Sequence, residues 1–591
     1  MATSKKPHGV SASRARIALI GLAVVAAWVG MGYRLVQIQV VQASEFAEKG
    51  LSQRFVSEDL APQRGKIFDR NGELLAMTVE SKSLYAVPGQ VEEPRWVAQQ
   101  LGALLDVDSE VLYDRLTSDR DFVFLKRQVD GVLAEELLGL DIRGVYGLPE
   151  PKRIYPAGAV ASHVAGFVNI DGAGQEGLEL VYDLELTGTP GKATFERSLD
   201  GKVIPLGTNN IVPAVPGMDL ITTIDLPLQY QAQQSCIEGL KRTGGKACWV
   251  VVLEVETGEI LAMTGAPVFD PETRETLDPD CESAEDSAAC KSFSNFSIRG
   301  IYEPGSTQKL ITVAAAIEEG EVSIGTVIPE VADELELLEG ACRSADDDLY
   351  GCYRDFKEHP TKDMSVAEIF VRSSNIGTIR IADTLGQDRL ISYIEAFGLG
   401  SKTGVDYSAE ASGILNFEAG CKTCWASAAI GYSVAATPLQ MAAAYAAVGN
   451  DGVWLTPHIV AAIADTEGET EVAGFRSQRV ISSGTSILMR DLLASVVEEG
   501  TGQAAAVDGY RVGGKTGTAN RLDENGRYTE ETRASFVGMA PIHDPKVVVA
   551  VLIDSPSFDF RTGGASAAPI FAEVMEQALY RLGVAPDGRA R

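Results

Sequence analysis

Histidine and basic residues are scarce in this chain. Only five of its 591 residues are histidine, and they are scattered singly along the sequence. Neither a Ser-His-Asp triad nor a zinc site is therefore indicated. Lysine and arginine number 51 against 82 acidic residues, so the formal charge is 51 − 82 = −31. Such a surface repels a phosphate backbone, which excludes nucleic acid as a partner.

Acidic residues are missing before Glu45. An uncharged apolar run, Ile17–Tyr33, lies in that region between N-terminal basic residues and Arg34. Its length is at the short end of the roughly 17–25 residues that cross a bilayer. The basic residues before it predict a cytoplasmic tail at 1–16, a transmembrane anchor at 17–37 and an extracytoplasmic remainder. A cleaved signal peptide is the alternative, but no clear small-x-small cleavage site follows the run.

Cysteine is missing before position 236, and the eight cysteines that follow are closely spaced. Outside the cytoplasm this pattern predicts local disulfides, although eight cysteines allow many connectivities. The expected pairs are Cys236–Cys248, Cys281–Cys290, Cys342–Cys352 and Cys421–Cys424. The last pair would instead suit a metal, but a second close Cys or His pair to complete four ligands is not present.

The chain after the anchor divides into two parts. Residues 45–215 consist of short turn-bounded segments, including a turn at Asn71-Gly72, and contain no arrangement of a nucleophile with a base. Proline and glycine within 213–219 predict a linker into a second domain, 216–585.

The second domain is expected to be an α/β sandwich. Helices are expected near Leu226–Leu240, over Met364–Leu385 and Leu439–Val448, and at Ala568–Leu582. Strands are expected at Trp249–Val255, Glu259–Thr264, Tyr510–Thr518, Ala534–Ala540 and Lys546–Asp554. Because helical sequence separates the two groups of strands, strands that are distant in the sequence should share one sheet.

The sharpest chemical signal is Ser306-Thr-Gln-Lys309, which follows Pro304-Gly305 and precedes an apolar helix. Ser306 is thus expected at a helix start, where unpaired amides and the positive end of the helix dipole gather. Lys309 lies one turn further on the same face. Burial would lower the pKa of this lysine, so that the neutral amine accepts the serine proton. The alternative is a capping serine beside a solvated lysine.

Two further elements match this chemistry. Ser373-Ser374-Asn375 is expected at a helix junction, where the Ser373 hydroxyl would relay a proton and the Asn375 amide would hold a substrate carbonyl. Ser373 could otherwise be an ordinary capping residue.

Lys515-Thr516-Gly517-Thr518 lies in a predicted strand. Glycine there permits a close backbone approach, as an extended peptide along the strand edge requires. Lys515, Thr516 and Thr518 would receive a terminal carboxylate, and the Thr518 amide would form an oxyanion hole with that of Ser306. A second Lys-Thr-Gly, at Lys402, has no β-run before it and is interpreted as a helix-exit turn.

These three motifs, in this order, resemble the signature of the penicillin-interacting serine enzymes. The finer resemblance is to class B penicillin-binding proteins, most like the septal branch with penicillin-binding protein 3, and covers nearly the whole chain. Further matching segments are Arg64–Ala76, Arg153–Pro156, His163, Gly174–Glu179, Gly500–Gly502, Gly509-Tyr510 and Ala534–Pro541. One departure is Ser433, where relatives usually carry a second glycine.

The resemblance implies an α/β fold: a serine β-lactamase/transpeptidase-like domain, its antiparallel sheet sandwiched by helices, on an extended α+β pedestal at 45–215. It implies a D,D-transpeptidase of the inner membrane whose catalytic domain lies in the periplasm. Ser306 would attack the penultimate D-alanine of a peptidoglycan stem peptide, release the terminal D-alanine, and pass the acyl group to a neighbouring amine. β-Lactams would acylate the same serine, and no cofactor or metal is needed.

Partners implied by the resemblance are a membrane glycan polymerase and other division proteins. The Tyr302–Thr307 segment and the lack of a long pedestal insertion favour septal synthesis over side-wall elongation. A β-lactamase or β-lactam receptor, and an inactive membrane scaffold, are the alternative functions. The long pedestal argues against the first, and three intact motifs argue against the second.

Overall fold

The structure is a computed structural model. It describes residues 10–46, 55–196, 204, 210–275, 293–343, 351–417, 421–465, 468–472, 474–523 and 527–587. These residues belong to two compact units. The first lies within Met1–Pro62 and Gly188–Pro216, and the second lies within Gln63–Thr187 and Gly217–Arg591.

The first unit contains the predicted N-terminal apolar helix. Helix α1 (Val10–Val36) continues into a π-helical turn, η1 (Gln37–Val41), and its apolar side chains, such as those of Ile17 and Trp28, are exposed. Among the described residues, one helix, Arg14–Val41, is long and apolar enough to cross a membrane. The unit also has an antiparallel sheet of β1 (Phe55–Leu60), β10 (Gly191–Glu196) and β11 (Asn210–Val212).

A six-stranded sheet in the second unit joins distant parts of the chain. Its order is β23 (Glu469–Glu471), β22 (Val460–Ala464), β12 (Asp219–Thr222), β2 (Ile67–Phe68), β3 (Leu74–Val79) and β7 (Lys152–Ile154). The turn between β2 and β3 is the predicted one, with Gly72 at a φ of 88° and the Asp69 Oδ1 atom accepting from the Asn71 and Glu73 amides. Strand β12 pairs with β2 on one side and with β22 on the other.

A smaller layer of the second unit packs three helices on three strands. The strands are β4 (Ser81–Ala86), β5 (Val123–Asp130) and β6 (Val145–Pro149), and the helices are α3 (Pro94–Leu105), α4 (Ser109–Leu116) and α5 (Gly131–Leu138). Short elements follow: α6 (Ser162–Ala165), β8 (Phe167–Val168), β9 (Gly174–Glu176), α7 (Gly177–Val181) and α8 (Asp183–Thr187). The fully buried Glu179 carboxylate pairs with both Arg64 and Arg153, and Arg64 also pairs with Asp183, so that two carboxylates balance the two arginine charges.

The main sheet has five antiparallel strands that are far apart in the sequence, as predicted. Its order is β14 (Ile260–Ala266), β13 (Ala247–Glu254), β27 (Val547–Asp554), β26 (Tyr528–Ala540) and β25 (Gly513–Leu522). Strand β25 therefore lies at an edge of the sheet.

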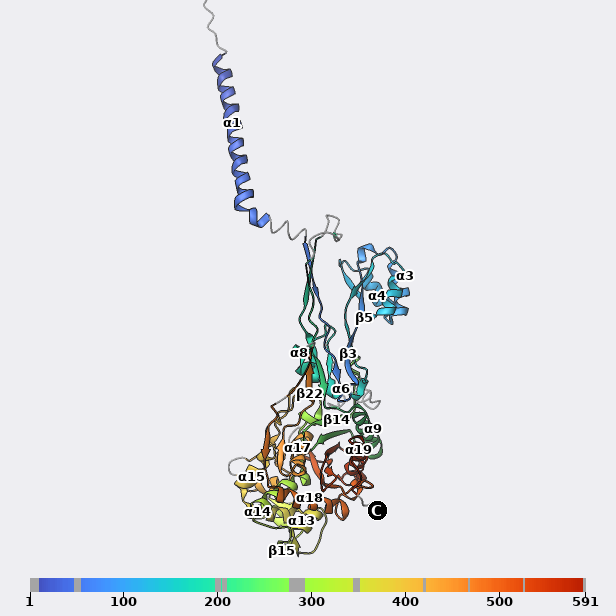
Figure 1. The fold of residues 1–591 in the computed structure, drawn as a ribbon, viewed down its shortest axis with the longest axis vertical. Helices are drawn as coiled ribbons and strands as arrows, with labels where there is room; N and C mark the ends of the chain where they lie inside the picture. The colour runs from blue at the N-terminus through green and yellow to red at the C-terminus, as the bar shows by residue number, and fades with distance from the viewer. Residues whose placement is uncertain are drawn as a thin grey trace, which may run out of the picture. The chain divides into compact units, whose positions relative to one another are not determined.

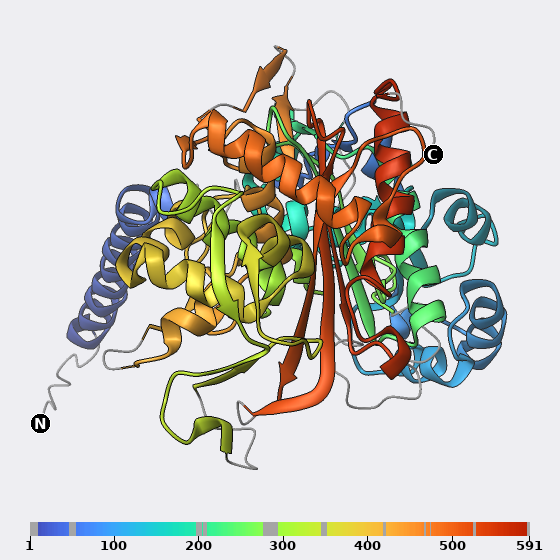
Figure 2. The same cartoon turned by 90° about the horizontal axis from the view of Figure 1, so that it is seen from below.

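Helices cover both faces of the main sheet. Successive side chains along its strands point to opposite faces, and they therefore belong to two different hydrophobic cores. Val250 and Phe536 belong to a core with α9 (Leu226–Thr243) and α19 (Ala567–Arg581). Val251 and Val537 belong to a core with α12 (Lys309–Glu318), α17 (Pro438–Gly449) and α18 (Ser483–Glu498). Figure 1 labels α9, α19, α17 and α18, and Figure 2 shows the two helical layers on either side of the strands. This arrangement confirms the predicted fold class.

One predicted helix is interrupted. Met364 belongs to a strand, and the helical part of Met364–Leu385 is divided into α13 (Val366–Arg372) and α14 (Asn375–Leu385). Ser373 separates them in a left-handed conformation, with a φ of 61°, so a continuous helix over this range is wrong. The break is the helix junction expected at Ser373–Asn375.

Shorter elements complete the second unit. They are α11 (Phe296–Arg299), η4 (Gly305–Gln308), β15 (Val327–Val331), β16 (Glu334–Glu336), β17 (Cys352–Arg354), β18 (Lys362–Ser365), α15 (Gln387–Ala396), β19 (Ile414–Leu415), α16 (Cys424–Ala429), β20 (Val434–Ala435), β21 (Val453–Leu455) and β24 (Ser477–Arg479). Disulfides Cys236–Cys248, Cys342–Cys352 and Cys421–Cys424 confirm three predicted pairs. The fourth predicted pair, Cys281–Cys290, lies outside the described residues.

Candidate active site

The predicted nucleophile lies on a short 3-10 turn that leads directly into a buried helix. Pro304 and Gly305 start this turn, η4, and Gly305 has a φ of 53°. The Gly305 amide donates to the Gly431 carbonyl at 3.0 Å, which fixes the backbone beside Ser306. Ser306 is partly exposed, whereas Lys309, at the start of α12, is fully buried. The serine can thus be reached from outside, while the Lys309 side chain is shielded from water.

Lys309 is bound from one side by the second motif. Its Nζ atom donates to the Ser373 carbonyl at 2.6 Å, to Asn375 Oδ1 at 2.7 Å and to Ser373 Oγ at 3.3 Å. Burial lowers the pKa of Lys309 to about 7, and the nearby Asp355 carboxylate opposes this effect. Near neutral pH a substantial fraction of this amine is therefore unprotonated and able to accept a proton.

The third motif contributes a second buried lysine. Lys515, on β25, is fully buried, and its Nζ atom donates to Ser373 Oγ at 2.8 Å. Its pKa lies well below the ordinary value because it is buried and because Lys309 is close. The two lysines thus converge on one hydroxyl, and the structure brings all three motifs together. This hydroxyl can therefore pass a proton between two amines whose basicity is lowered.

Strand β25 also packs against the nucleophile segment itself. A Cβ atom on Gly517 would lie 2.7 Å from the Pro304 carbonyl oxygen and 2.3 Å from Ser535 Oγ, so only glycine fits. The close approach at Gly517 is thus made by the chain's own residues, rather than by a bound peptide as the sequence suggested. Because β25 is an edge strand, its outer side can still pair with an extended peptide.

The two threonines of the third motif are held by loops. Thr516 Oγ1 lies 2.7 Å from Thr501 Oγ1, in the Gly500–Gly502 segment. Thr518 Oγ1 accepts from the Gly563 amide at 3.2 Å. These contacts orient both hydroxyls at the edge of the sheet. The second Lys-Thr-Gly lies elsewhere: Lys402 is exposed in the loop after α15, and Thr403 binds Glu410. Residues 402–404 thus lie in a loop just after the turn that ends α15, and not in a strand.

Sequence reasoning missed two groups beside the site. His359 was interpreted as an isolated histidine, but its Nε2 atom lies 3.0 Å from Asp355 Oδ2. Asp355 in turn accepts from the backbone amides of Asn375 and Ile376. The one available signal was the Asp355-x-x-x-His359 spacing shortly before the Ser-x-Asn motif.

Comparison with known families decides the identity of this fold. Residues 248–576 match the family described as Penicillin binding protein transpeptidase domain, and residues 59–222 match the Penicillin-binding Protein dimerisation domain. The chain belongs to the class B penicillin-binding proteins. Stage V sporulation protein D of Bacillus subtilis is 34% identical over 533 residues, which cover 89% of this chain and 79% of the relative.

Other members are similar over almost their whole length. The probable peptidoglycan D,D-transpeptidase PenA of Neisseria meningitidis is 32% identical over 590 residues, covering 98% of this chain and 95% of the relative. The crystal structure of penicillin-binding protein 3 from Mycobacterium tuberculosis, complexed with aztreonam, has 27% identity and a TM-score of 0.67, covering 90% of this chain and 98% of that one.

This penicillin-binding protein is therefore an enzyme of the transpeptidase type. The family confirms the predicted resemblance, the fold class and the penicillin-sensitive transpeptidase activity. Among the described residues, the one apolar helix long enough to cross a membrane lies at the N-terminus, which is consistent with a single-pass inner-membrane protein.

Proposed function

We propose that this penicillin-binding protein cross-links peptidoglycan stem peptides at the division septum through an acyl-enzyme on Ser306. The observation that supports this most is the convergence of Lys309 and Lys515 on the Ser373 hydroxyl, beside the turn that carries Ser306. A buried, weakly basic amine and a proton relay are what an acyl transfer by serine requires.

In the acylation step, neutral Lys309 accepts the Ser306 proton as the serine oxygen attacks the penultimate D-alanine carbonyl. The amides of Ser306 and Thr518 stabilise the resulting oxyanion. Ser373 relays the proton from Lys309 to the departing amine as the C–N bond breaks, which releases the terminal D-alanine. In the second step the neighbouring stem's amine attacks the ester, loses its proton through the same relay, and frees Ser306.

Substrate recognition is assigned to the edge of the sheet. Lys515, with Thr516 and Thr518, binds the terminal carboxylate of the donor peptide, and Gly517 keeps this stretch of strand close to the nucleophile. A carboxylate arriving beside the buried Lys515 stabilises its charged form, so that binding offsets part of the cost of desolvation. Asn375 donates one hydrogen of its side-chain amide to the Arg354 carbonyl, and its second hydrogen is assigned to the substrate carbonyl.

The anchor and the family support a proposal for the cellular context. We assign residues 1–16 to the cytoplasm, 17–37 to the membrane, and both the pedestal (45–215) and the catalytic domain (216–585) to the periplasm. The Tyr302–Thr307 segment and the similarity to a penicillin-binding protein 3 favour septal synthesis over side-wall elongation. A membrane glycan polymerase and other division proteins are the proposed partners, because the proposed domains include no glycan-polymerising one.

The test uses the full chain in detergent with uncross-linked glycan polymer that carries pentapeptide stems. We expect release of D-alanine together with cross-linked peptide dimers, both lost in Ser306→Ala and kept in Lys402→Ala. Fluorescent penicillin separates the alternatives: an adduct that persists for many minutes fits a transpeptidase, rapid loss fits a β-lactamase, and no adduct fits an inactive scaffold. Either of the last two results would contradict the proposal.

A further inference from the structure

A buried carboxylate lies directly behind the second motif. Asp355 follows strand β17, and only 6% of its side chain is exposed. Its Oδ1 atom accepts from the amides of Asn375 and Ile376, the latter at 3.0 Å. Its Oδ2 atom lies 3.0 Å from His359 Nε2. Two amides of α14 are thus bound by one carboxylate oxygen, and the other oxygen of the same carboxylate is held by a histidine.

The two amides are at the start of α14, where a helix has donors without partners inside the helix. Ser374 satisfies a third donor, because its Oγ atom accepts from the Gly377 amide at 2.9 Å. Helix α14 is therefore capped twice, once by its own Ser374 and once by a distant carboxylate. A negative charge at this end is also favoured by the helix dipole. The start of α14 is thereby fixed in position relative to Asp355.

Asn375 is held at this start by its side chain as well. Its Nδ2 atom donates to the Arg354 carbonyl at 2.6 Å, while its Oδ1 atom accepts from Lys309 at 2.7 Å. Because an amide has one acceptor end and one donor end, the contact with Arg354 turns the oxygen toward Lys309. Backbone and side chain of Asn375 are thus both set by the two residues 354 and 355.

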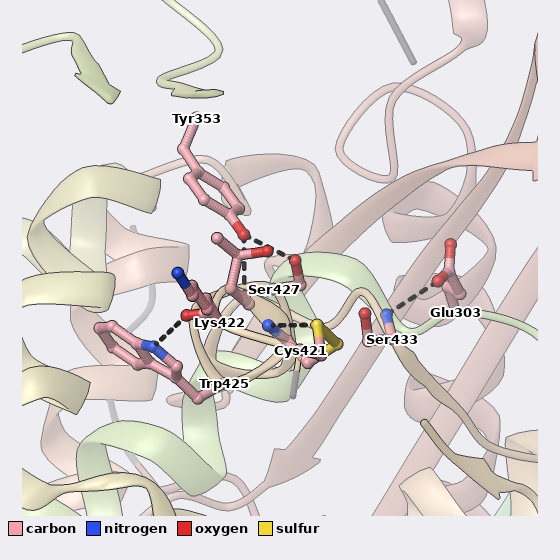
Figure 3. The surroundings of a disulfide bond; sticks show 9 residues. Glu303, Tyr353, Cys421, Lys422, Trp425, Ser427 and Ser433 are labelled. Carbon is pink, nitrogen blue, oxygen red and sulfur yellow. Dashed lines mark hydrogen bonds between the residues drawn. A yellow bond between two sulfur atoms is a disulfide. The ribbon is translucent and has the colours of Figure 1, made fainter. Parts of the chain in front are cut away.

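The segment that carries Asp355 is itself firmly attached. Strand β17 pairs with β16, and its first residue forms the Cys342–Cys352 disulfide. The Tyr353 hydroxyl donates to the Thr423 carbonyl at 3.0 Å and lies 2.8 Å from Ser427 Oγ, beside the Cys421–Cys424 disulfide. Figure 3 shows Tyr353 reaching Ser427 above this disulfide. Asp355 therefore projects from a frame that is cross-linked at two places.

We propose that Asp355, held by His359, is a positioning residue that fixes the Ser373–Asn375 segment against Lys309 for acyl transfer. The inference rests on the proposed function of the site. It assigns Asp355 two separable effects: its oxygens hold the start of α14, and its charge acts on Lys309. The charged groups that face Lys309 are Asp355 and, from β25, Lys515. The charged groups that face Asp355 are His359 and Lys309. The Asp333 carboxylate also acts on the charge of His359.

The two effects predict different outcomes for two variants. Asp355→Ala removes the hydrogen bonds and the charge, so the maximal rate of acylation, above the inflection of the pH–rate profile, should fall by about 10- to 100-fold, as for a catalytic group displaced by about 1 Å. The inflection of its profile should also move to lower pH. Asp355→Asn keeps an acceptor of the same shape but removes the charge that favours protonated Lys309. Its maximal rate should stay within about threefold of wild type on this account, while the inflection of its pH–rate profile moves to lower pH.

The experiment measures the second-order rate of acylation by fluorescent penicillin, with the full chain in detergent, between pH 5.5 and 9. Asp388→Asn is the matched control, since Asp388 is an exposed carboxylate in the first turn of the neighbouring helix α15; its profile should equal that of wild type. Thermal melting shows whether each variant folds, and if Asp355→Ala does not fold, the shift in Asp355→Asn decides alone.

The proposal is overturned if Asp355→Ala acylates within twofold of wild type, or if Asp355→Asn leaves the inflection in place. These results are distinct from a failure of the proposed function. In that case wild-type protein would itself not be acylated on Ser306.

Discussion

The Lys515 Nζ atom lies 2.8 Å from the Ser373 Oγ atom, although 142 residues separate them in the chain. Lys309 Nζ reaches the same oxygen at 3.3 Å from another element. Two buried amines beside one hydroxyl cannot both keep a full charge at low cost, because each loses hydration and repels the other. This relationship makes the site sensitive to pH and gives the predictions that follow.

The first prediction concerns pH. Burial lowers the pKa of Lys309 to about 7, and only the neutral amine accepts the Ser306 proton. The rate of acylation by a β-lactam should therefore rise as pH increases through about 7 and level off above it. Stopped-flow measurement of the second-order rate of acylation, with penicillin well below saturation, checks this because that rate reports the pKa of the free enzyme. A profile that is flat from pH 6 to 8, or one that falls in this range, would contradict the role of Lys309 as base.

The second prediction compares the two Lys-Thr-Gly segments. Lys515→Ala should lower the acylation rate by about 100-fold or more, because it removes both a contact to Ser373 and the proposed carboxylate-binding charge. Lys402→Ala is the matched control and should acylate like wild type, since Lys402 is exposed in a loop away from β25. Equal rates for the two variants would show that β25 is not part of the site.

The third prediction concerns the loop beside the nucleophile. Ser433 has a φ of 61°, a conformation that favours glycine. Ser433→Gly should therefore change the free energy of unfolding by no more than about 1 kcal/mol, since relief of strain offsets the added freedom of the unfolded chain. Gly431→Ala should lose at least about 2 kcal/mol, because its Cβ atom would lie 2.0 Å from the Gly305 carbonyl oxygen. Chemical denaturation checks both, and equal stability of the two variants would contradict this packing.

The fourth prediction concerns the Cys236–Cys248 disulfide, which closes a loop with a sequence separation of 12 and is fully buried between α9 and β13. Replacing both cysteines by alanine should lower the free energy of unfolding by about 3 kcal/mol, through the greater freedom of the unfolded chain. The same double substitution at the partly exposed Cys421–Cys424 pair, with a separation of 3, should cost less. A larger loss at the shorter loop would contradict this ranking.

Much of the fold and site follows from local sequence. The β-branched runs that form β13 and β27 predict buried strands, and the alanine-rich segments predict the covering helices. Short motifs identify Ser306, Lys309, Ser373 and Lys515. Ser306 and Lys309 are spaced by one helical turn, and Lys515 lies in a run of residues that predicts a strand. Their convergence on a single hydroxyl depends on the sheet order, which places β25 at the edge.

The remainder depends on tertiary contacts without local periodicity. Asp355 and His359 lie in an irregular segment, so their alignment with the start of α14 has no repeating signature. The junction at Ser373 is indicated by the Ser-Ser-Asn sequence, but its left-handed backbone, with a φ of 61°, has no local signature. The approach of Pro304 and Ser535 to Gly517 likewise depends on strand pairing across the sheet.

The most direct test of the account is to identify the acylated residue. Full-length protein is incubated with a β-lactam, digested, and analysed by mass spectrometry of its peptides. The account predicts that the antibiotic's mass is added to Ser306 alone, and that Ser306→Ala, folded as judged by its melting temperature, gains no mass on any peptide. An adduct on another residue, or continued acylation of Ser306→Ala, would contradict it.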